Sequence, residues 1–324
     1  MTHSLQFFGG LVALLIGGRL LVAASVDTAR RLEVSPLVVG LTLVAWGTSA
    51  PELALNLISA FKGRGQLALG NVVGANICNM ALVLGMCALI RPLVVQERLI
   101  KVEIWLNAAI LAPLAGLGLL TRLGRWEAAL MLAVFGVYSA WTVAAALRQS
   151  GRARTPRAAD TIGPDPTMDR RPMGWVMIGT CFAGGVVLLS LGGWLASDGA
   201  SGIALGLGIP AAVVGVTIVA LGTTLPEMVT GTTAVWRRQT DLAMGNAIGS
   251  CLFNAGAILG ITGLISPPTV DRSLVLPLAY MGVLAVALVP ISRTFGKTVS
   301  RLEGSLLMVS YVVFLGILAW IASR

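Results

Sequence analysis

Two short strings place a carboxylate beside a proline inside long apolar segments of the sequence. They are 47–52 (GTSAPE) and 222–227 (GTTLPE), and they lie 175 residues apart. A carboxylate held in lipid costs several kcal/mol unless a positive charge lies next to it. Neither string contains a basic residue, which indicates that the partner is a mobile cation. The strings therefore predict a cation-binding site, and they make the chain a candidate ion transporter.

The proline of each string also changes the backbone around it. Because Pro51 and Pro226 lack an N–H, we expect the carbonyl oxygens of Gly47 and Gly222 to lose their helical donors. Inside a membrane, such an oxygen is tolerated where it is buried in protein, lines a wet cavity or binds an ion. A proline kink alone, or a hydroxyl that bonds back to its own helix, is the competing explanation for one string. Two equivalent copies favour ion binding, because packing does not require both glutamates.

Oxygen-bearing side chains surround the two strings and define the candidate site. An all-oxygen set with two carboxylates suits hard cations, and Ca²⁺ takes about 6–8 oxygen ligands. No thiolate or histidine is placed to favour zinc or copper, and we expect no tightly bound cofactor. Asn71 and Asn246 are weaker candidates, expected to support the helix breaks without touching the ion. The candidate ligands are Thr48, Ser49, Glu52, Asn79, Thr223, Thr224, Glu227, Ser250 and Asn254.

The same offset of 175 residues relates much longer stretches. Residues 67–74 (LALGNVVG) match 242–249 (LAMGNAIG), and the glycine pair at 17–18 matches that at 192–193. The chain is therefore a duplicated unit. Within it, the GxxxG pairs at 70–74 and 245–249 predict close helix packing.

The composition indicates a membrane protein. The chain has 324 residues, 56% hydrophobic and 11% charged, with a mean hydropathy of +0.87, which is too apolar for a soluble globule. A membrane helix needs about 20 residues. We expect an all-α membrane protein with ten transmembrane helices, at about 5–24, 36–61, 66–90, 102–120, 127–147, 174–196, 209–235, 242–265, 274–291 and 303–322.

The distribution of basic residues predicts the topology. Sixteen Lys and Arg residues fall in loops after odd-numbered helices and six on the other side, which puts the odd-numbered loops in the cytoplasm. We expect a first repeat at 1–147, a cytoplasmic linker at 148–172 and a second repeat at 173–324, with both termini outside the plasma (inner) membrane. Five helices per repeat make the topology of the two repeats inverted. The net charge of +9 suits anionic membrane lipid rather than nucleic acid.

The remaining polar and sulfur-containing residues have simpler explanations. Because the four cysteines lie in apolar helices without a CxxC pair, they are expected to pack rather than react. Three acids near helix ends are expected to be solvated at the interface: Glu103, Glu127 and Asp198.

The paired GT[ST]xPE strings and the GNxxG motifs resemble the calcium/cation antiporter superfamily, specifically its bacterial sodium/calcium exchanger branch. The resemblance covers both repeats and nearly the whole chain. It implies a cation site at mid-membrane, formed by the second, third, seventh and eighth helices, in which the carbonyls of Ala45 and Ala220 join the ligands above. It also implies that one Ca²⁺ or several Na⁺ bind alternately, and that the first and sixth helices move.

Three positions depart from the pattern of that family. Ala75 stands where a serine ligand is common, Cys251 replaces an asparagine, and Asn254 is an aspartate in some members. Two carboxylates balance one Ca²⁺, whereas three Na⁺ would leave excess charge in a low dielectric. We therefore expect coupling below three Na⁺ per Ca²⁺, or protons on the glutamates.

Other functions use the same residues differently. A cation/proton or K⁺-coupled exchanger on this fold remains open, and the sequence does not separate Na⁺, K⁺ and H⁺ as coupling ions. A cation channel would pass uncoupled current through the same carboxylates. An enzyme is disfavoured, because Ser49 and Ser250 have no histidine or lysine nearby as a base.

Overall fold

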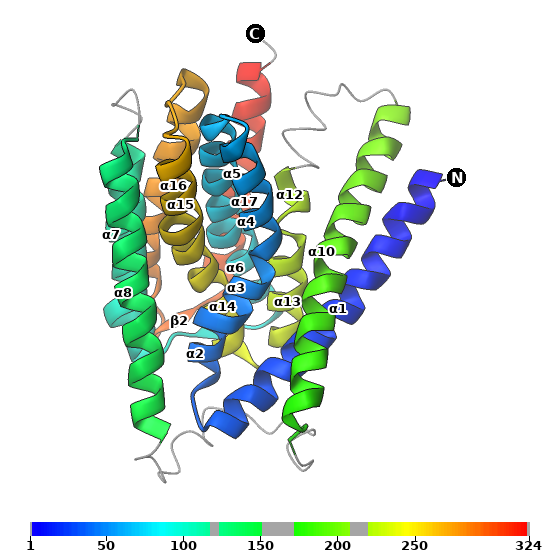
Figure 1. Cartoon of the computed structure of the whole chain (residues 1–324), viewed down its shortest axis with the longest axis vertical. Coiled ribbons are helices and arrows are strands. Elements are labelled where there is room, and N and C mark those ends of the chain that lie inside the picture. The colour runs from blue at the N-terminus through cyan, green and yellow to red at the C-terminus, as the bar shows by residue number, and fades with distance from the viewer. Residues whose placement is uncertain (1, 117–122, 151–171, 208–219, 323–324) are drawn as a thin grey trace.

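The computed structural model describes residues 2–116, 123–150, 172–207 and 220–322, and this part of the chain is mostly helical (Figure 1). Its first half contains α1 (Thr2–Leu32), α2 (Pro36–Val39), η1 (Gly40–Val44), α3 (Ala45–Thr48), α4 (Ala50–Phe61), α5 (Gly65–Ile77), η2 (Cys78–Val83), α6 (Leu84–Ile90), β1 (Leu93–Val94), η3 (Leu99–Glu103), α7 (Ile104–Gly116) and α8 (Arg125–Ser150). Its second half contains α10 (Trp175–Gly206), α12 (Ala220–Gly222), α13 (Leu225–Trp236), α14 (Thr240–Leu252), η6 (Phe253–Ile258), α15 (Leu259–Ile265), α16 (Arg272–Ile291), β2 (Thr298–Val299) and α17 (Arg301–Ala322).

The described helices include eight that are long and apolar enough to cross a membrane. A ninth span arises if Pro36–Thr48 and Ala50–Phe61, which meet at a bend of 48°, are counted together. A helical membrane protein is therefore confirmed. The span expected at 209–235 lies only partly within the described residues, as α12 and α13. Most of the expected linker, residues 151–171, also lies outside them.

Helices α1 and α10 are longer than the sequence predicted. The spans expected at 5–24 and 174–196 were too short, since the helices cover 31 and 32 residues. An apolar run stops at charged residues such as Asp198, but backbone hydrogen bonding continues past them. A 31-residue helix is about 46 Å long, against about 30 Å of hydrocarbon, and both helices lie side by side at an incline to the rest of the bundle (Figure 1).

The duplication predicted from the sequence reappears in the bounds of the helices. Four elements of the first half begin and end 175 residues before their counterparts in the second half. The short π-helical segments η2 and η6 are one of these pairs, so even the irregular turns are duplicated. The pairs are α4 with α13, α5 with α14, η2 with η6, and α6 with α15.

Helix α14 lies at the centre of the bundle, and every residue from Leu242 to Leu252 is buried. Its glycines allow this position, as predicted. A methyl group added to Gly245 would lie 2.6 Å from the carbonyl oxygen of Leu37, and one added to Gly249 would lie 2.8 Å from the Cα atom of Leu41. At the equivalent GxxxG pair of α5, a methyl group added to Gly70 would lie 3.5 Å from a side-chain carbon of Leu274, and one added to Gly74 would meet nothing within 4 Å, so the close packing predicted there is not seen among the described residues.

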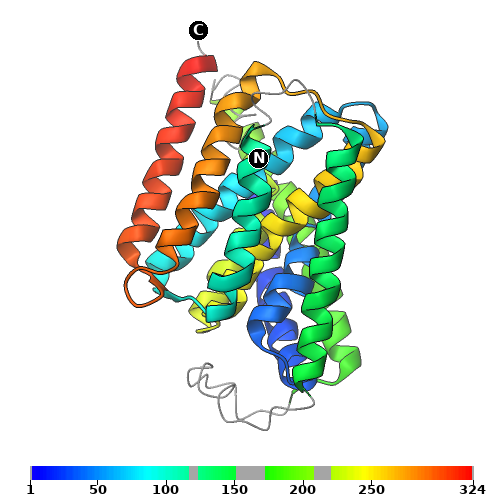
Figure 2. The same cartoon turned by 90° about the vertical axis from the view of Figure 1, so that its left-hand side faces the viewer.

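One short antiparallel pairing, β1 with β2, departs from the all-α expectation. Leu93 pairs with Val299 and Val94 with Thr298. The pairing ties the segment after α6 to the segment before α17. Figure 2 shows α16 and α17 side by side along one edge, where Tyr280 stacks on Phe314 with ring centroids 4.5 Å apart.

Candidate cation-binding site

The two glutamates lie in the first turns of broken helices. Between α3 and α4 the backbone leaves helical geometry at Ser49 (φ −88°, ψ 8°), and Glu52 follows in the first turn of α4. Thr224 has nearly the same conformation (φ −88°, ψ −3°) before Glu227 in the first turn of α13. Since unpaired N–H groups and the helix dipole favour negative charge at a helix N-terminus, each break suits a carboxylate.

The fold brings the two strings together, although they are far apart in sequence. The Ser49 hydroxyl donates a hydrogen bond of 3.0 Å to Oε1 of Glu227. Glu52 and Glu227 are each only 1% exposed, and two carboxylates buried in one core repel one another when both are ionised. This arrangement is unfavourable without a positive charge between or beside the two acids.

Buried oxygens that lack a donor gather on these and the neighbouring elements. Buried side-chain oxygens almost always have a hydrogen-bond partner, so a set without one is informative. Within the described part of the chain, six candidate ligands have such an oxygen: Glu52 (Oε2), Asn79 (Oδ1), Thr224 (Oγ1), Glu227 (Oε2), Ser250 (Oγ) and Asn254 (Oδ1). This donor set fits Ca²⁺ or Na⁺, which need oxygen ligands.

Hydrogen bonds within the first half, and one to Asn246 of the second half, surround the first break. The Thr48 hydroxyl lies 3.2 Å from Oδ1 of Asn246 and 3.1 Å from the carbonyl oxygen of Val44. Asn246 of the second half therefore contacts the candidate ligand Thr48 at this break, and its supporting role stays a prediction. The carbonyl oxygen of Ala45 accepts from the Ser49 N–H at 3.0 Å and lies 3.4 Å from the Thr48 hydroxyl. The Thr48 hydroxyl must turn away before that carbonyl faces an ion unobstructed.

The remaining predicted ligands lie on both halves. Asn79 and Asn254 belong to the π-helical segments η2 and η6, and such segments are frequent at functional sites. Ser250 lies in the last turns of α14 and is fully buried. Thr223, in the turn before α13, is only half-buried, and Ala220 is the first residue of α12.

Two buried asparagines of this region were missed in the sequence. Asn56 lies four residues after Glu52 and donates to its carbonyl oxygen at 2.7 Å. Asn76 is fully buried, and its Oδ1 accepts a hydrogen bond of 3.3 Å from Nδ2 of Asn254. Their helical spacing could have identified them in the sequence, since Asn56 falls one turn from Glu52 and Asn76 one turn from Asn79.

The expectation that Glu103 is solvated at the interface was wrong. Glu103 is fully buried, and its Oε1 accepts hydrogen bonds from Nε of Arg98 at 3.0 Å and from the Tyr138 hydroxyl at 3.3 Å. Arg98 also donates to Thr142 at 3.2 Å. The acid is tolerated because the guanidinium neutralises it, so this cluster joins η3 to α8 rather than binding an ion.

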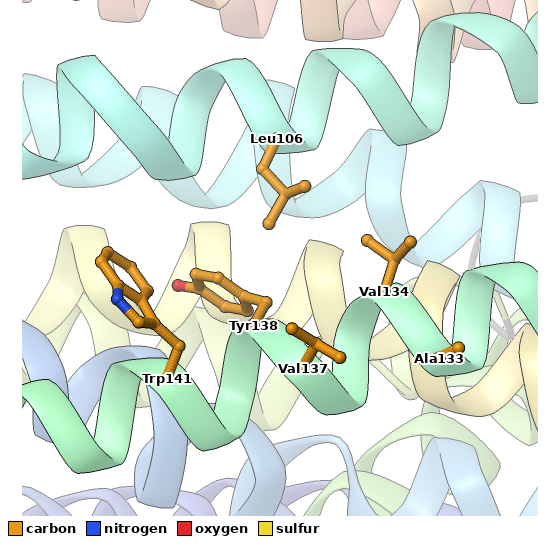
Figure 3. Close-up of a pocket in the computed structure, with 6 residues that line it drawn as sticks. All are labelled: Leu106, Ala133, Val134, Val137, Tyr138 and Trp141. Carbon is orange, nitrogen blue, oxygen red and sulfur yellow. The ribbon is translucent and has the colours of Figure 1, made fainter.

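A groove between α7 and α8 contains none of the candidate ligands and does not suit a cation. Figure 3 shows its lining, which is almost wholly apolar, with the Tyr138 hydroxyl and the Trp141 ring nitrogen as its only polar side-chain atoms. A hydrocarbon chain fits this surface better than a cation does. The lining residues are Leu106, Ala133, Val134, Val137, Tyr138 and Trp141.

Comparison with known proteins matches this chain over nearly its full length. A family model described as sodium/calcium exchanger protein matches residues 3–144 and 178–320. The putative antiporter CaxA of Alkalimonas amylolytica is 33% identical over 310 residues, which cover 94% of each chain. The sodium/calcium exchanger MaX1 of Methanosarcina acetivorans is 31% identical and covers 96% of this chain and 97% of its own.

A solved structure shows the same fold. The sodium-calcium exchanger NCX_Mj, soaked with 10 mM Na⁺ and 10 mM Sr²⁺, superimposes with a TM-score of 0.81 at 27% sequence identity. The match covers 98% of this chain and 99% of that one.

Proposed function

Because the chain belongs to the sodium/calcium exchanger family, we propose that it exchanges Ca²⁺ for Na⁺ by alternating access at a site shared by Glu52 and Glu227. The observation that carries this is the contact between Ser49 and Glu227, made among buried oxygens that lack donors. The family consists of secondary transporters, which confirms that the chain is not an enzyme.

The ligand set is the one predicted from the sequence. Glu52 and Glu227 neutralise Ca²⁺, and the neutral oxygens of both halves complete its coordination. Na⁺ ions use overlapping oxygens, so the two cations compete for one site. The full set is Ala45 and Ala220 (carbonyls), Thr48, Ser49, Glu52, Asn79, Thr223, Thr224, Glu227, Ser250 and Asn254.

The architecture in this proposal is ten helices in two repeats of inverted topology, 1–147 and 173–324, joined by a cytoplasmic linker at 148–172. The matching bounds of the described helices support the duplication. Both termini are placed outside an inner membrane by the distribution of Lys and Arg. The start of α1 and the end of α17 lie toward the same end of the bundle in Figure 1, in agreement with an even number of spans.

Alternating access follows from the charge of the site. When it is empty, two buried carboxylates repel one another, so the conformational change is disfavoured. A bound Ca²⁺, or Na⁺ ions in its place, neutralises the acids and permits the change. The moving elements in this mechanism are α1 and α10, whose glycines bring them together. A methyl group added to Gly17 would lie 2.9 Å from the carbonyl oxygen of Gly185.

The decisive experiment is uptake of radioactive Ca²⁺ into proteoliposomes, driven in turn by gradients of Na⁺, K⁺ and H⁺. We expect the Na⁺ gradient to drive uptake, and Glu52→Gln and Glu227→Gln each to abolish it. Glu127→Gln is the matched control, because Glu127 is exposed at the start of α8 and should leave uptake unchanged. Uptake driven only by K⁺ or H⁺ would establish the alternative coupling ion, and uptake that needs no gradient would indicate a channel.

A further inference from the structure

Two residue pairs, related by the repeat offset of 175, show that the site is not symmetric. Asn76 corresponds to Cys251, and Asn79 corresponds to Asn254. In one pairing across the halves, Nδ2 of Asn254 donates to Oδ1 of Asn76 at 3.3 Å. This bond fixes which way the Asn254 amide faces, and the Oδ1 atom of Asn254 is left without a donor.

The corresponding hydrogen bond, from the Asn79 amide to the residue at position 251, is absent. Its acceptor would be the residue at position 251, but Cys251 has no amide oxygen. Its thiol instead donates weakly, at 3.9 Å, to the backbone oxygen of Asn76. Within the described residues, both polar atoms of the Asn79 side chain lack a partner, although Asn79 is only 1% exposed.

No neighbouring thiol replaces the missing acceptor. The Cys78 sulfur is within hydrogen-bond distance of the Tyr311 hydroxyl, at 3.3 Å. Leaving a buried amide unpaired is unfavourable, and packing alone does not require it, since an apolar side chain of similar size would leave no polar atom unpaired. An unpaired amide beside two acids is accounted for if its oxygen turns to a cation when one is bound.

We propose that Asn76 is a positioning residue that fixes the Asn254 amide as a cation ligand, whereas Cys251 leaves the Asn79 amide free to turn. The two halves of the site then bind cations unequally, with a preformed oxygen in one half and an adaptable oxygen in the other. This inference rests on the proposed function of the site, and it assigns roles to two residues outside the ligand set.

The first test is a double-mutant cycle on equilibrium binding of radioactive Ca²⁺ to the purified full chain in detergent. We expect Asn76→Ala to weaken binding about threefold to tenfold, the effect of losing one orienting hydrogen bond. Because Asn76 acts through Asn254, it should have no further effect in an Asn254→Ala background. In an Asn79→Ala background it should keep its full effect.

The second test changes the other half. Cys251→Asn supplies the missing acceptor, so Ca²⁺ binding should change by about threefold or more, and only while Asn79 is present. Cys251→Ala, which adds no acceptor, is the matched control and should bind as the wild type does. The exchanged double variant Asn76→Cys with Cys251→Asn should move the orienting hydrogen bond from the 76–254 pair to the 251–79 pair, so that the effect of the residue at 251 is lost in an Asn79→Ala background and kept in an Asn254→Ala background.

The results that would refute this inference differ from the results that would refute the proposed function. Multiplicative effects of Asn76→Ala and Asn254→Ala, or equal effects of Cys251→Asn with and without Asn79, would refute the inference while Glu52→Gln still abolishes binding. Ca²⁺ binding that survives both Glu52→Gln and Glu227→Gln would instead refute the site itself. Elution as a monodisperse species and the melting temperature of each variant separate loss of folding from loss of binding.

Discussion

At the scale of single residues, the candidate site is distinguished by two buried acids, and its contacts differ from those of the buried acid Glu103. No group of three or more His, Cys, Asp or Glu side chains that could together hold a metal ion occurs among the described residues, so the acids of the candidate site are Glu52 and Glu227 alone among the described residues. The contrast with Glu103 is informative. That buried acid has a guanidinium partner at 3.0 Å, whereas Glu227 has the Ser49 hydroxyl as a partner and each of the two site acids keeps one oxygen without a donor.

The number of acids predicts the stoichiometry of exchange. Two carboxylates balance one Ca²⁺ or two Na⁺, and excess charge is unfavourable in a low dielectric. We therefore expect a reversal potential in proteoliposomes that corresponds to fewer than three Na⁺ per Ca²⁺. Asn254→Asp, which adds a third carboxylate, should shift the ratio upward. A wild-type ratio of three to one would contradict the argument.

The cluster around Glu103 predicts a structural effect of mutation. Glu103→Ala removes the partner of Arg98 and of the Tyr138 hydroxyl, so we expect the free energy of unfolding to fall by about 1–3 kcal/mol. Glu103→Gln, which keeps an oxygen acceptor for both donors, should cost less. Denaturant unfolding in detergent measures both. Ca²⁺ binding by the folded fraction should be unchanged, and a loss of binding there would place Glu103 in the site.

At the scale of elements, breaks and close crossings matter more than helix length. The breaks at Ser49 and Thr224 end one helix and start another, which puts Glu52 and Glu227 in first turns with unpaired N–H groups. The crossing of α1 and α10 depends on glycines that face the backbone of the other helix. Gly185 is one of these, since a methyl group there would lie 2.9 Å from the backbone nitrogen of Leu21.

Two adjacent glycines of α10 allow a controlled test of that crossing. Gly184→Ala and Gly185→Ala gain the same helix propensity, about 1 kcal/mol, but the space around Gly184 is open. We expect Gly184→Ala to leave exchange unchanged and Gly185→Ala to slow it, because α1 and α10 must separate by a few tenths of an ångström. Ca²⁺ binding at equilibrium should be equal in the two variants. Equal exchange rates would show that close packing of α1 on α10 is dispensable.

At the scale of the whole molecule, the halves are joined at the site and at the end of the bundle that carries β1 and β2. There Glu97 accepts hydrogen bonds from Lys297 at 2.9 Å and from Lys101 at 3.4 Å. These bonds hold the pKa of the exposed Glu97 carboxyl below its ordinary value of 4.5. The contact connects segments 200 residues apart, so it restrains one half relative to the other.

The sign of that pKa shift predicts how the contact depends on pH. A lowered pKa means that the stabilisation is fully present above pH 4.5 and is lost as the pH falls through the folded value. We expect Lys297→Ala to lower the melting temperature slightly near pH 7, since exposed ion pairs contribute little. This difference from the wild type should vanish in acid, and Lys297→Arg should show none. A difference that persists in acid would exclude the ion pair as its cause.

The sequence alone determined the membrane class, the duplication and the two breaks, and it predicted the residues of the candidate site. These features are local, because hydropathy, proline chemistry and a fixed repeat offset can be read along one chain. The ends of α1 and α10 could not be read in this way, because backbone hydrogen bonds continue past the apolar runs.

Only the tertiary structure decided which polar groups satisfy one another. It placed Ser49 on Glu227 and Asn254 on Asn76 across the halves, gave Glu103 a guanidinium partner, and left Asn79 without a partner among the described residues. The physical reason is that the cost of a buried polar atom depends on what lies within hydrogen-bond distance of it. For Glu227 and Asn254 that neighbour comes from the other repeat, 178 residues away, and the packing of the two halves selects it.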